Sequence, residues 1–383
     1  MKQISAYALL ILVVALTGTQ LVPDVQATGT EEKPAMTPNV ESEEGGAILD
    51  GLTHRGNWIS YMGALVSCAR YLDPDVSVAW LWGSTGYAFS LTVHEALCPS
   101  GPYMPVDKID HLLGNTGFDL ETLRIEANEA GFAERIEELF SRTRVAIDSG
   151  APVMGWSLDS IDWYPVHGYD GEGNYLFLRH NGHLGTYPHG KLGEKAPGGL
   201  ALLNIVHKGS PPDDAAVVRD ALSFAAKMGR GGFTEEAYTS GLGGYDAWIA
   251  ALAQPEDPPD DGTVFGHAFN AACWYECRRQ AVAFLEEAKQ RLSDSSLPGP
   301  FDKAITHYTV VADRFKTLTE LFPCQPGKMA PMRERFRNAE LREKAIAALT
   351  AARTAEAEGL ESLPEIERAL ASGTAGSGNR TSR

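Results

Sequence analysis

The chain has little positive charge and few cysteines. Its 383 residues include 33 Lys and Arg against 50 Asp and Glu, for a net charge of -17, and only 5 cysteines. Nucleic acids and anionic lipids attract clusters of basic side chains, so an acidic chain without a basic run makes both poor partners. No repeat period is found either, which argues against a solenoid, and the even spread of apolar residues predicts a globular protein.

The longest apolar run lies at the N-terminus. It reads AYALLILVVALTG, follows Lys2 and is too short to span a bilayer comfortably. Small residues in VQA then end at Ala27, so residues 1–27 are expected to be a signal peptide that is cleaved after Ala27. We expect a secreted or periplasmic protein without membrane contact after cleavage; an uncleaved anchor is the alternative. Residues 28–46 are rich in Glu, Pro and Thr, which predicts a disordered linker.

Export would place the cysteines in an oxidising compartment. Cys273 and Cys277 lie four residues apart on one face of a predicted helix, and no second Cys or His pair follows at metal-ligand spacing. We expect one of them to bond Cys324, and Cys68 to bond Cys98, which leaves one thiol over. The pairing stays open.

Metal and cofactor signals are also weak. His180, His183 and His189 fall within ten residues, but their spacing fits no ligand pattern, and GSTG at residues 83–86 lacks the glycines and the following Lys of a phosphate loop. We therefore expect no metal and no cofactor.

Apolar spacing predicts a leading helix, with Asn57 as its N-cap and a buried stripe that begins at Trp58 and Met62 and ends at Leu72. A short helix and a strand are expected over residues 76–93, and helix over residues 107–148. Four β-rich runs then follow, APVMGWSL, WYPVHGY, NYLFLRH and ALLNIVHKG, with DGEGN as a hairpin turn. These four runs predict an antiparallel sheet.

The pattern predicts an α+β fold. One α+β domain is expected over residues 47–208, with its leading helix packed on the sheet. An all-α domain over residues 209–372 and a disordered tail over residues 373–383 complete the organisation.

Two segments carry a family resemblance. DSGAPVMGWSLDSIDWYPVHGYDGEGNYLF resembles the G-x-P-V … V-x-G-Y-D segment of bacteriocin-processing papain-like peptidases and of the butirosin-biosynthesis acyltransferase domain. YLDPDVSVAWLWGSTGYAFSL and the helical tail are similar to the latter group and its uncharacterised bacterial relatives. The resemblance covers most of the chain after the leader and implies a papain-like α+β domain.

The resemblance also implies a site. Such enzymes place a Cys nucleophile at the start of the leading helix, a His at the start of a strand, and an Asp or Asn on the next strand that orients the His. Here the nucleophile position matches Ser60 and the base position matches Asp162, while Asn181 or His180 occupies the orienting position. His167 alternates to the opposite face from Asp162, so we expect it to pack beneath the sheet.

Aromatic residues surround these positions in the predicted fold. They could stack on a ligand, with Thr85 as a polar contact, or they could simply be core. The candidates are Trp58, Trp82, Tyr87, Phe89 and Trp163.

Two functions follow. The first is a degenerate, non-catalytic relative that binds a peptide-like or small acyl-bearing ligand. The alternative is an amide hydrolase or acyltransferase that uses Ser60 with a nearby base such as His167, His54 or His94, which requires an imidazole within about 3.5 Å of Ser60 Oγ. A third class, an interaction protein acting through its helical tail, has no identified partner. The oligomeric state is not predicted.

Overall fold

The computed structural model describes residues 39–43, 45–95, 97, 111–233, 237–254, 260–292 and 298–377. The predicted leader therefore lies outside the described residues, as do residues 378–383 of the predicted tail. Two compact units are present. The α+β unit holds the described residues up to Val76 together with Phe118–Ser210, and the helical unit holds Ser77–Gly117 together with those from Pro211 onward.

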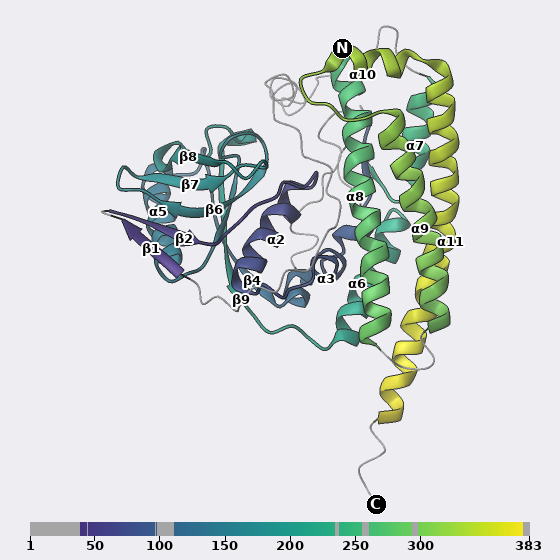
Figure 1. Cartoon of the computed structure of the whole chain (residues 1–383), viewed down its shortest axis with the longest axis horizontal. Helices are drawn as coiled ribbons and strands as arrows, with labels where there is room; N and C mark the ends of the chain where they lie inside the picture. Colours follow the sequence, from purple (N-terminus) through teal and green to yellow (C-terminus); the bar gives the residue numbers. More distant parts are fainter. Residues whose placement is uncertain are drawn as a thin grey trace, which may run out of the picture. The chain divides into compact units, whose positions relative to one another are not determined.

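The α+β unit is built on one antiparallel sheet with the order β1-β2-β6-β5-β9-β4, and β7 pairs with β6 and β8 (Figure 1). The predicted strands and the hairpin are confirmed. Asp170 Oδ1 accepts hydrogen bonds from the Glu172 and Asn174 amides in the turn that joins β6 to β7. The strands are β1 (Asn39–Glu43), β2 (Gly46–Asp50), β4 (Phe118–Glu126), β5 (Val153–Trp156), β6 (Trp163–Tyr169), β7 (Asn174–Leu178), β8 (Leu184–Pro188) and β9 (Leu200–Lys208).

Helices cover both faces of this sheet. Helix α5 (Phe132–Asp148) packs Leu139 and Ile147 into the core with Tyr164 and Val166 of β6. Helix α2 (Ser60–Leu72) lies on the other face, and the Cys68 thiol contacts the Val153 carbonyl oxygen of β5 at 3.9 Å (Figure 1). The predicted leading helix on a sheet is thus observed.

Two local predictions in this unit are wrong. Residues 118–126 form strand β4 rather than helix, because Leu123 and Ile125 are buried between exposed neighbours and all nine residues pair with β9. The end of the predicted linker is also structured, since β1 pairs with β2 over five residues. Gly45, at φ +81°, provides the left-handed turn between them. Short 3₁₀ turns span Gly114–Thr116, His189–Lys191 and Pro197–Gly199.

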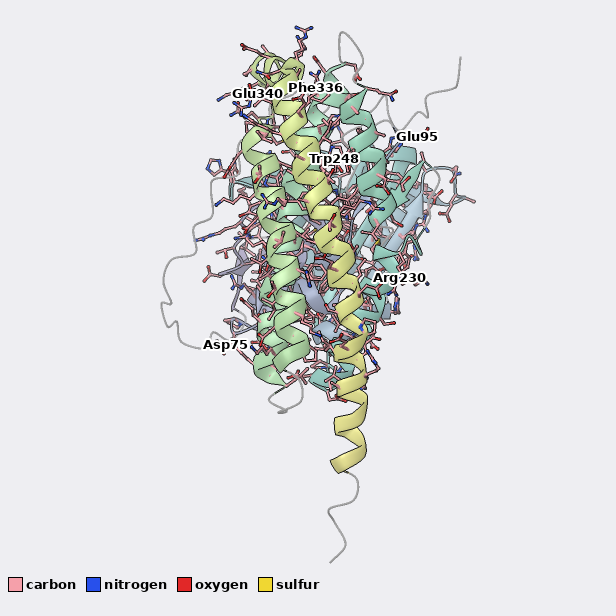
Figure 2. All side chains as sticks on the ribbon, turned by 90° about the vertical axis from the view of Figure 1, so that its right-hand side faces the viewer. Asp75, Glu95, Arg230, Trp248, Phe336 and Glu340 are labelled. Carbon is pink, nitrogen blue, oxygen red and sulfur yellow. The ribbon has the colours of Figure 1, made fainter. Side chains whose placement is uncertain are left out.

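In the helical unit, α11 packs along α9 and α7, and α8 packs along α9. Figure 2 shows Trp248 and Phe336 toward the end at which α11 begins, near Glu340. None of the helices in the described ranges is both long and apolar enough to cross a membrane. The elements are α3 (Val78–Ser84), η1 (Tyr87–Phe89), β3 (Thr92–His94), α6 (Asp214–Gly229), β10 (Tyr238–Ser240), α7 (Leu242–Ala253), α8 (Asp261–Arg291), α9 (Pro298–Leu321), α10 (Met329–Arg337) and α11 (Ala339–Ser377).

Residues 77–117 belong to the helical unit, which corrects the predicted uninterrupted domain over residues 47–208. The side chain of Phe284 on α8 fills the space that a Cβ would need at Gly83, and its ring packs against Trp80 and Phe89. Arg278 of α8 donates hydrogen bonds to the carbonyl oxygens of Ala88 and Ser90, at 3.1 and 2.7 Å. These contacts hold α3 and η1 against α8.

The expected disulfides are absent from the described residues. Cys68, Cys273, Cys277 and Cys324 form no disulfide, while Cys98 lies outside the described residues. Cys68 is fully buried under the sheet, and Cys273 and Cys277 lie on the buried face of α8. Burial therefore accounts for these three cysteines as small core residues.

Candidate functional site

Ser60 is the first residue of α2. The helix starts after Ile59, whose side chain makes no cap hydrogen bond, so the predicted Asn57 cap is wrong. Asn57 instead lies against Gly63, and because glycine has no Cβ, the Asn57 side chain can come close to the helix at this point. The Ser60 hydroxyl accepts a hydrogen bond from the Trp163 amide at 3.2 Å and donates one to the Asp162 carboxylate. Ser60 therefore connects the start of α2 to the start of β6.

Asp162 is presented by a tight loop between β5 and β6. Ser157 begins this loop with φ +61°, a left-handed conformation that costs free energy in a non-glycine residue, and its amide donates to the Asp162 carbonyl oxygen at 2.8 Å. The Asp162 amide in turn donates to Ser160 O at 2.8 Å. Backbone strain is thus localised at the residue that leads into the candidate site.

The Asp162 carboxylate collects three side-chain donors. Ser160 Oγ lies 2.9 Å from Oδ2, His180 Nε2 lies 3.5 Å from the same oxygen, and Ser60 supplies the third hydrogen bond. Burial alone would raise the pKa of Asp162, but the hydrogen bond and charge of His180 with the two serine hydroxyls outweigh it, and the pKa is lowered. The side chain remains one-third exposed, at 33%.

His180 follows β7 and is held between two neighbours. Its carbonyl oxygen accepts from the Gly56 amide at 2.8 Å, and a Cβ at Gly56 would lie 2.6 Å from the His180 Cβ, so only glycine fits there. On the other side its ring packs on Tyr164, with centroids 4.9 Å apart. Of the two residues that could occupy the orienting position, the structure brings His180 to Asp162.

A second histidine lies behind His180. His54 Nε2 is 3.3 Å from His180 Nδ1, and His54 Nδ1 is 2.8 Å from Ser67 Oγ on α2. His54 is only 5% exposed. Burial and the charge of His180 lower the pKa of His54 to about 3, so this imidazole is neutral.

Two arrangements of protons satisfy the hydrogen bonds from Ser67 through His54 and His180 to Asp162. If Ser67 donates to His54 Nδ1, then His54 Nε2–H donates to His180 and His180 Nε2–H donates to Asp162, and both rings are neutral. If Ser67 donates to Gly63 O, at 2.9 Å, His54 donates to Ser67 and His180 must carry two protons. In both arrangements His180 Nε2–H points at Asp162, so His180 has no lone pair left to accept a proton from Ser60.

The order of groups is therefore hydroxyl, carboxylate, imidazole. The group beside the Ser60 hydroxyl is a carboxylate whose lowered pKa makes it a weak base. The Ser60 hydroxyl bonds the Trp163 amide and the Asp162 carboxylate, whereas His54 bonds Ser67 and His180, and His180 bonds His54 and Asp162. This geometry fits anchoring of the helix to the sheet better than activation of a nucleophile.

The other histidines considered as bases lie elsewhere. His167 is 9% exposed in β6, beside a register shift against β7, and its Nε2 has no hydrogen-bond partner. Burial lowers the pKa of His167 to about 4. His94 belongs to the helical unit, where its ring packs on Tyr238.

The aromatic candidates separate into the two units. Trp58 and Trp163 lie in the α+β unit, where Trp163 packs edge-on against Tyr61 and at a tilt against Trp156. Four other candidates are core residues of the helical unit, with no more than 4% of their surface exposed, so their predicted ligand contact is not supported. They are Trp82, Thr85, Tyr87 and Phe89.

The neighbouring histidines do not gather around a metal position. His189 binds Gly173 O and Glu137 and stacks on Phe140, whereas His180 binds Asp162. Over the residues that can be described, no group of three or more His, Cys, Asp or Glu side chains could hold a metal ion.

Sequence reasoning did not identify the residues around the central carboxylate. Ser160 donates to Asp162 and contacts Tyr164 Oη at 2.5 Å, and Tyr164 Oη also accepts from the Ser160 amide at 3.1 Å. Ser67 was likewise missed. The cluster of Ser and Asp in WSLDSIDWY was the available signal, because short polar side chains favour tight hydrogen-bonded loops.

Comparison of the chain with models of protein families finds no match, and comparison with curated protein sequences finds none either.

Proposed function

We propose that this protein is a non-catalytic relative of the papain-like peptidases and acyltransferases, and that it binds a peptide-like or acyl-bearing ligand at the Ser60–Asp162–His180 site. The proposal is carried by one observation. The three residues at the positions where the resemblance expects nucleophile, base and orienting residue are hydrogen-bonded in one cluster, but the carboxylate stands between the hydroxyl and the imidazole.

A hydroxyl in place of a thiol and a carboxylate in place of an imidazole support the loss of catalysis. A serine hydroxyl is far less acidic than a cysteine thiol and requires a well-placed base to become a nucleophile. The carboxylate beside it has a lowered pKa, and the imidazole nitrogens are directed at Asp162 and His54. The proton acceptor beside the Ser60 hydroxyl is therefore a weakly basic carboxylate and not an imidazole.

Export is part of the proposal. The leader sequence at residues 1–27 supports a secreted or periplasmic protein, in which the ligand would be met outside the cytoplasm.

Steady-state turnover tests the loss of catalysis. Wild-type protein and Ser60→Ala are incubated with libraries of peptides, esters and amides, and product is quantified by mass spectrometry. We expect no turnover above background for either protein. Turnover by the wild type that disappears in Ser60→Ala would overturn the proposal in favour of an active hydrolase or acyltransferase.

A designed gain of reactivity tests the positional correspondence. Ser60→Cys combined with Asp162→His and His180→Asn would restore the thiol, imidazole and amide that the family resemblance implies. A thiol paired with an imidazolium at a helix start reacts with iodoacetamide well below pH 7, whereas an ordinary thiol does not. We expect rapid alkylation at position 60 in the triple variant and slow alkylation in Ser60→Cys alone; equal, slow rates would contradict the correspondence.

A further inference from the structure

The side-chain donors of the site are already used. His180 Nε2, Ser160 Oγ and Ser60 Oγ direct their protons at the Asp162 carboxylate. Since Ser160 spends its one proton there, the Tyr164 hydroxyl at 2.5 Å donates to Ser160. A ligand carbonyl oxygen, which needs donors, finds none among these side chains.

Acceptor capacity remains open in the same place. A carboxylate offers about four lone-pair positions, and three donors reach Asp162. Its side chain is one-third exposed, so part of the Asp162 side chain is open to solvent. The Ser60 oxygen accepts one hydrogen bond, from the Trp163 amide, and has a second lone pair.

The charge at this site is negative when the imidazoles are neutral. Two basic side chains of the same unit are engaged with a different carboxylate: Arg179 Nε lies 2.8 Å from Asp159 Oδ2 and Lys195 Nζ lies 3.8 Å from Asp159 Oδ1. Burial and the charge of His180 keep the adjacent His54 imidazole neutral, so at most one of the two imidazoles carries a positive charge.

Two tryptophans lie close to Asp162 and Ser60 in the sequence, and a third packs on one of them. Trp163 follows Asp162 directly, and Trp156, which is partly exposed, packs on it with ring centroids 5.5 Å apart. Trp58, also partly exposed, precedes Ser60 by two residues. Exposed indole faces attract organic cations more strongly than other aromatic rings do.

We propose that the ligand of this site presents a protonated amine to Asp162, as the amino terminus of a peptide does. This inference rests on the proposed function and narrows it: the peptide-like ligand is bound through its ammonium group and not through an acyl carbonyl. The ammonium donates to Asp162 and Ser60 and lies against the indole rings.

Two peptides that differ only in the amine provide the test. Trialanine amide and N-acetyl-trialanine amide are titrated into the full chain by calorimetry, and backbone NMR shifts of Ser60 and Trp163 locate the binding. We expect the free-amine peptide to bind at least tenfold more tightly, with an affinity that falls as salt is added. Asp162→Asn should abolish the difference between the peptides, and Glu172→Gln, which neutralises an exposed carboxylate in the β6–β7 turn, should preserve it.

The outcomes separate the two levels of the proposal. Equal affinity of the wild type for both peptides, with NMR shifts at Ser60, would overturn recognition through the amine. It would still support a ligand site at Ser60. A preference for the free-amine peptide that persists in a folded Asp162→Asn variant would also overturn recognition of the amine by Asp162. Absence of binding by either peptide overturns the amine proposal and counts against the proposed function as well. If Asp162→Asn does not fold, the salt dependence of the wild-type preference decides, because a neutral contact would not respond to salt.

Discussion

His54 should make the α+β unit sensitive to mild acid. Burial and the charge of His180 lower the pKa of His54 from 6.5 to about 3. Between these values the unfolded chain binds a proton that the folded chain refuses, so stability is present above pH 6.5 and is lost as pH falls. The loss continues down to about pH 3.

The magnitude follows from the pH interval. A pH of 5 lies about 1.5 units below the pKa of the unfolded imidazole, so protonation stabilises the unfolded chain by about 2 kcal/mol. The folded imidazole remains almost unprotonated at this pH, so the folded chain gains almost nothing. We therefore expect the free energy of unfolding of this unit to fall by about 2 kcal/mol from pH 7 to pH 5 through His54 alone. His167, whose pKa burial lowers to about 4, adds a loss of the same sign.

The assay must read this unit apart from the helical unit. Urea unfolding at pH 7 and pH 5 is followed by pulsed hydrogen exchange of peptides from β5 and β6. His54→Gln, which cannot titrate, should reduce the pH-dependent loss by about 2 kcal/mol, and the exposed His183→Gln should leave it unchanged. A loss that is identical in the wild type and His54→Gln would refute the reasoning, because another group would then carry it.

Three further predictions concern packing. Arg278→Met should destabilise the helical unit by about 3–5 kcal/mol, because it leaves the buried Glu356 carboxylate unpaired, and adding Glu356→Leu should restore much of the loss in urea unfolding. Gly56→Ala should cost about 1–3 kcal/mol and displace His180, seen as changed NMR shifts of its ring, since the new Cβ would meet His180 at 2.6 Å. A chain that ends at Gly209 should aggregate or bind hydrophobic dyes, because it removes α8 from Trp80 and Phe89.

Each of these has a contradicting result. An Arg278→Met variant as stable as the wild type would show that the Arg278–Glu356 ion pair is dispensable. Unchanged NMR shifts of the His180 ring in Gly56→Ala would show that the segment before α2 moves aside and His180 does not. A monomeric, dye-free chain ending at Gly209 would contradict the assignment of residues 77–117 to the helical unit.

Much of the α+β unit could be predicted from local sequence patterns. The apolar stripe in α2 and the short β-rich runs of β5, β6, β7 and β9 are such patterns, and the structure forms a helix and four strands there. Strand β4 was missed because an edge strand with Arg124 and Glu126 on its polar face, and Glu121 on the same face as Leu123 and Ile125, resembles an amphipathic helix over so short a span. Residues 77–117 were assigned to the wrong unit because apolar side chains alone do not indicate which of two hydrophobic cores they join. The contacts with Phe284 and Arg278 of α8 place them in the helical unit.

The site was predicted in part. The positions of Ser60 and Asp162 followed from the family resemblance, and their hydrogen bond is observed. The choice of His180 over Asn181 depends on the direction in which a side chain leaves a turn, which spacing does not determine. His54 and Ser67 join the network across elements far apart in sequence, so no local pattern could have identified that contact.

The most direct measurement is the reactivity of the hydroxyl itself. The full chain and Ser60→Ala are treated with a fluorophosphonate that modifies activated serines, and adducts are located by mass spectrometry of peptides. The absence of a neighbouring imidazole predicts no adduct at Ser60 under conditions that label a serine hydrolase completely. A stoichiometric adduct at Ser60 would show that a base does reach this hydroxyl and would contradict the loss of catalysis.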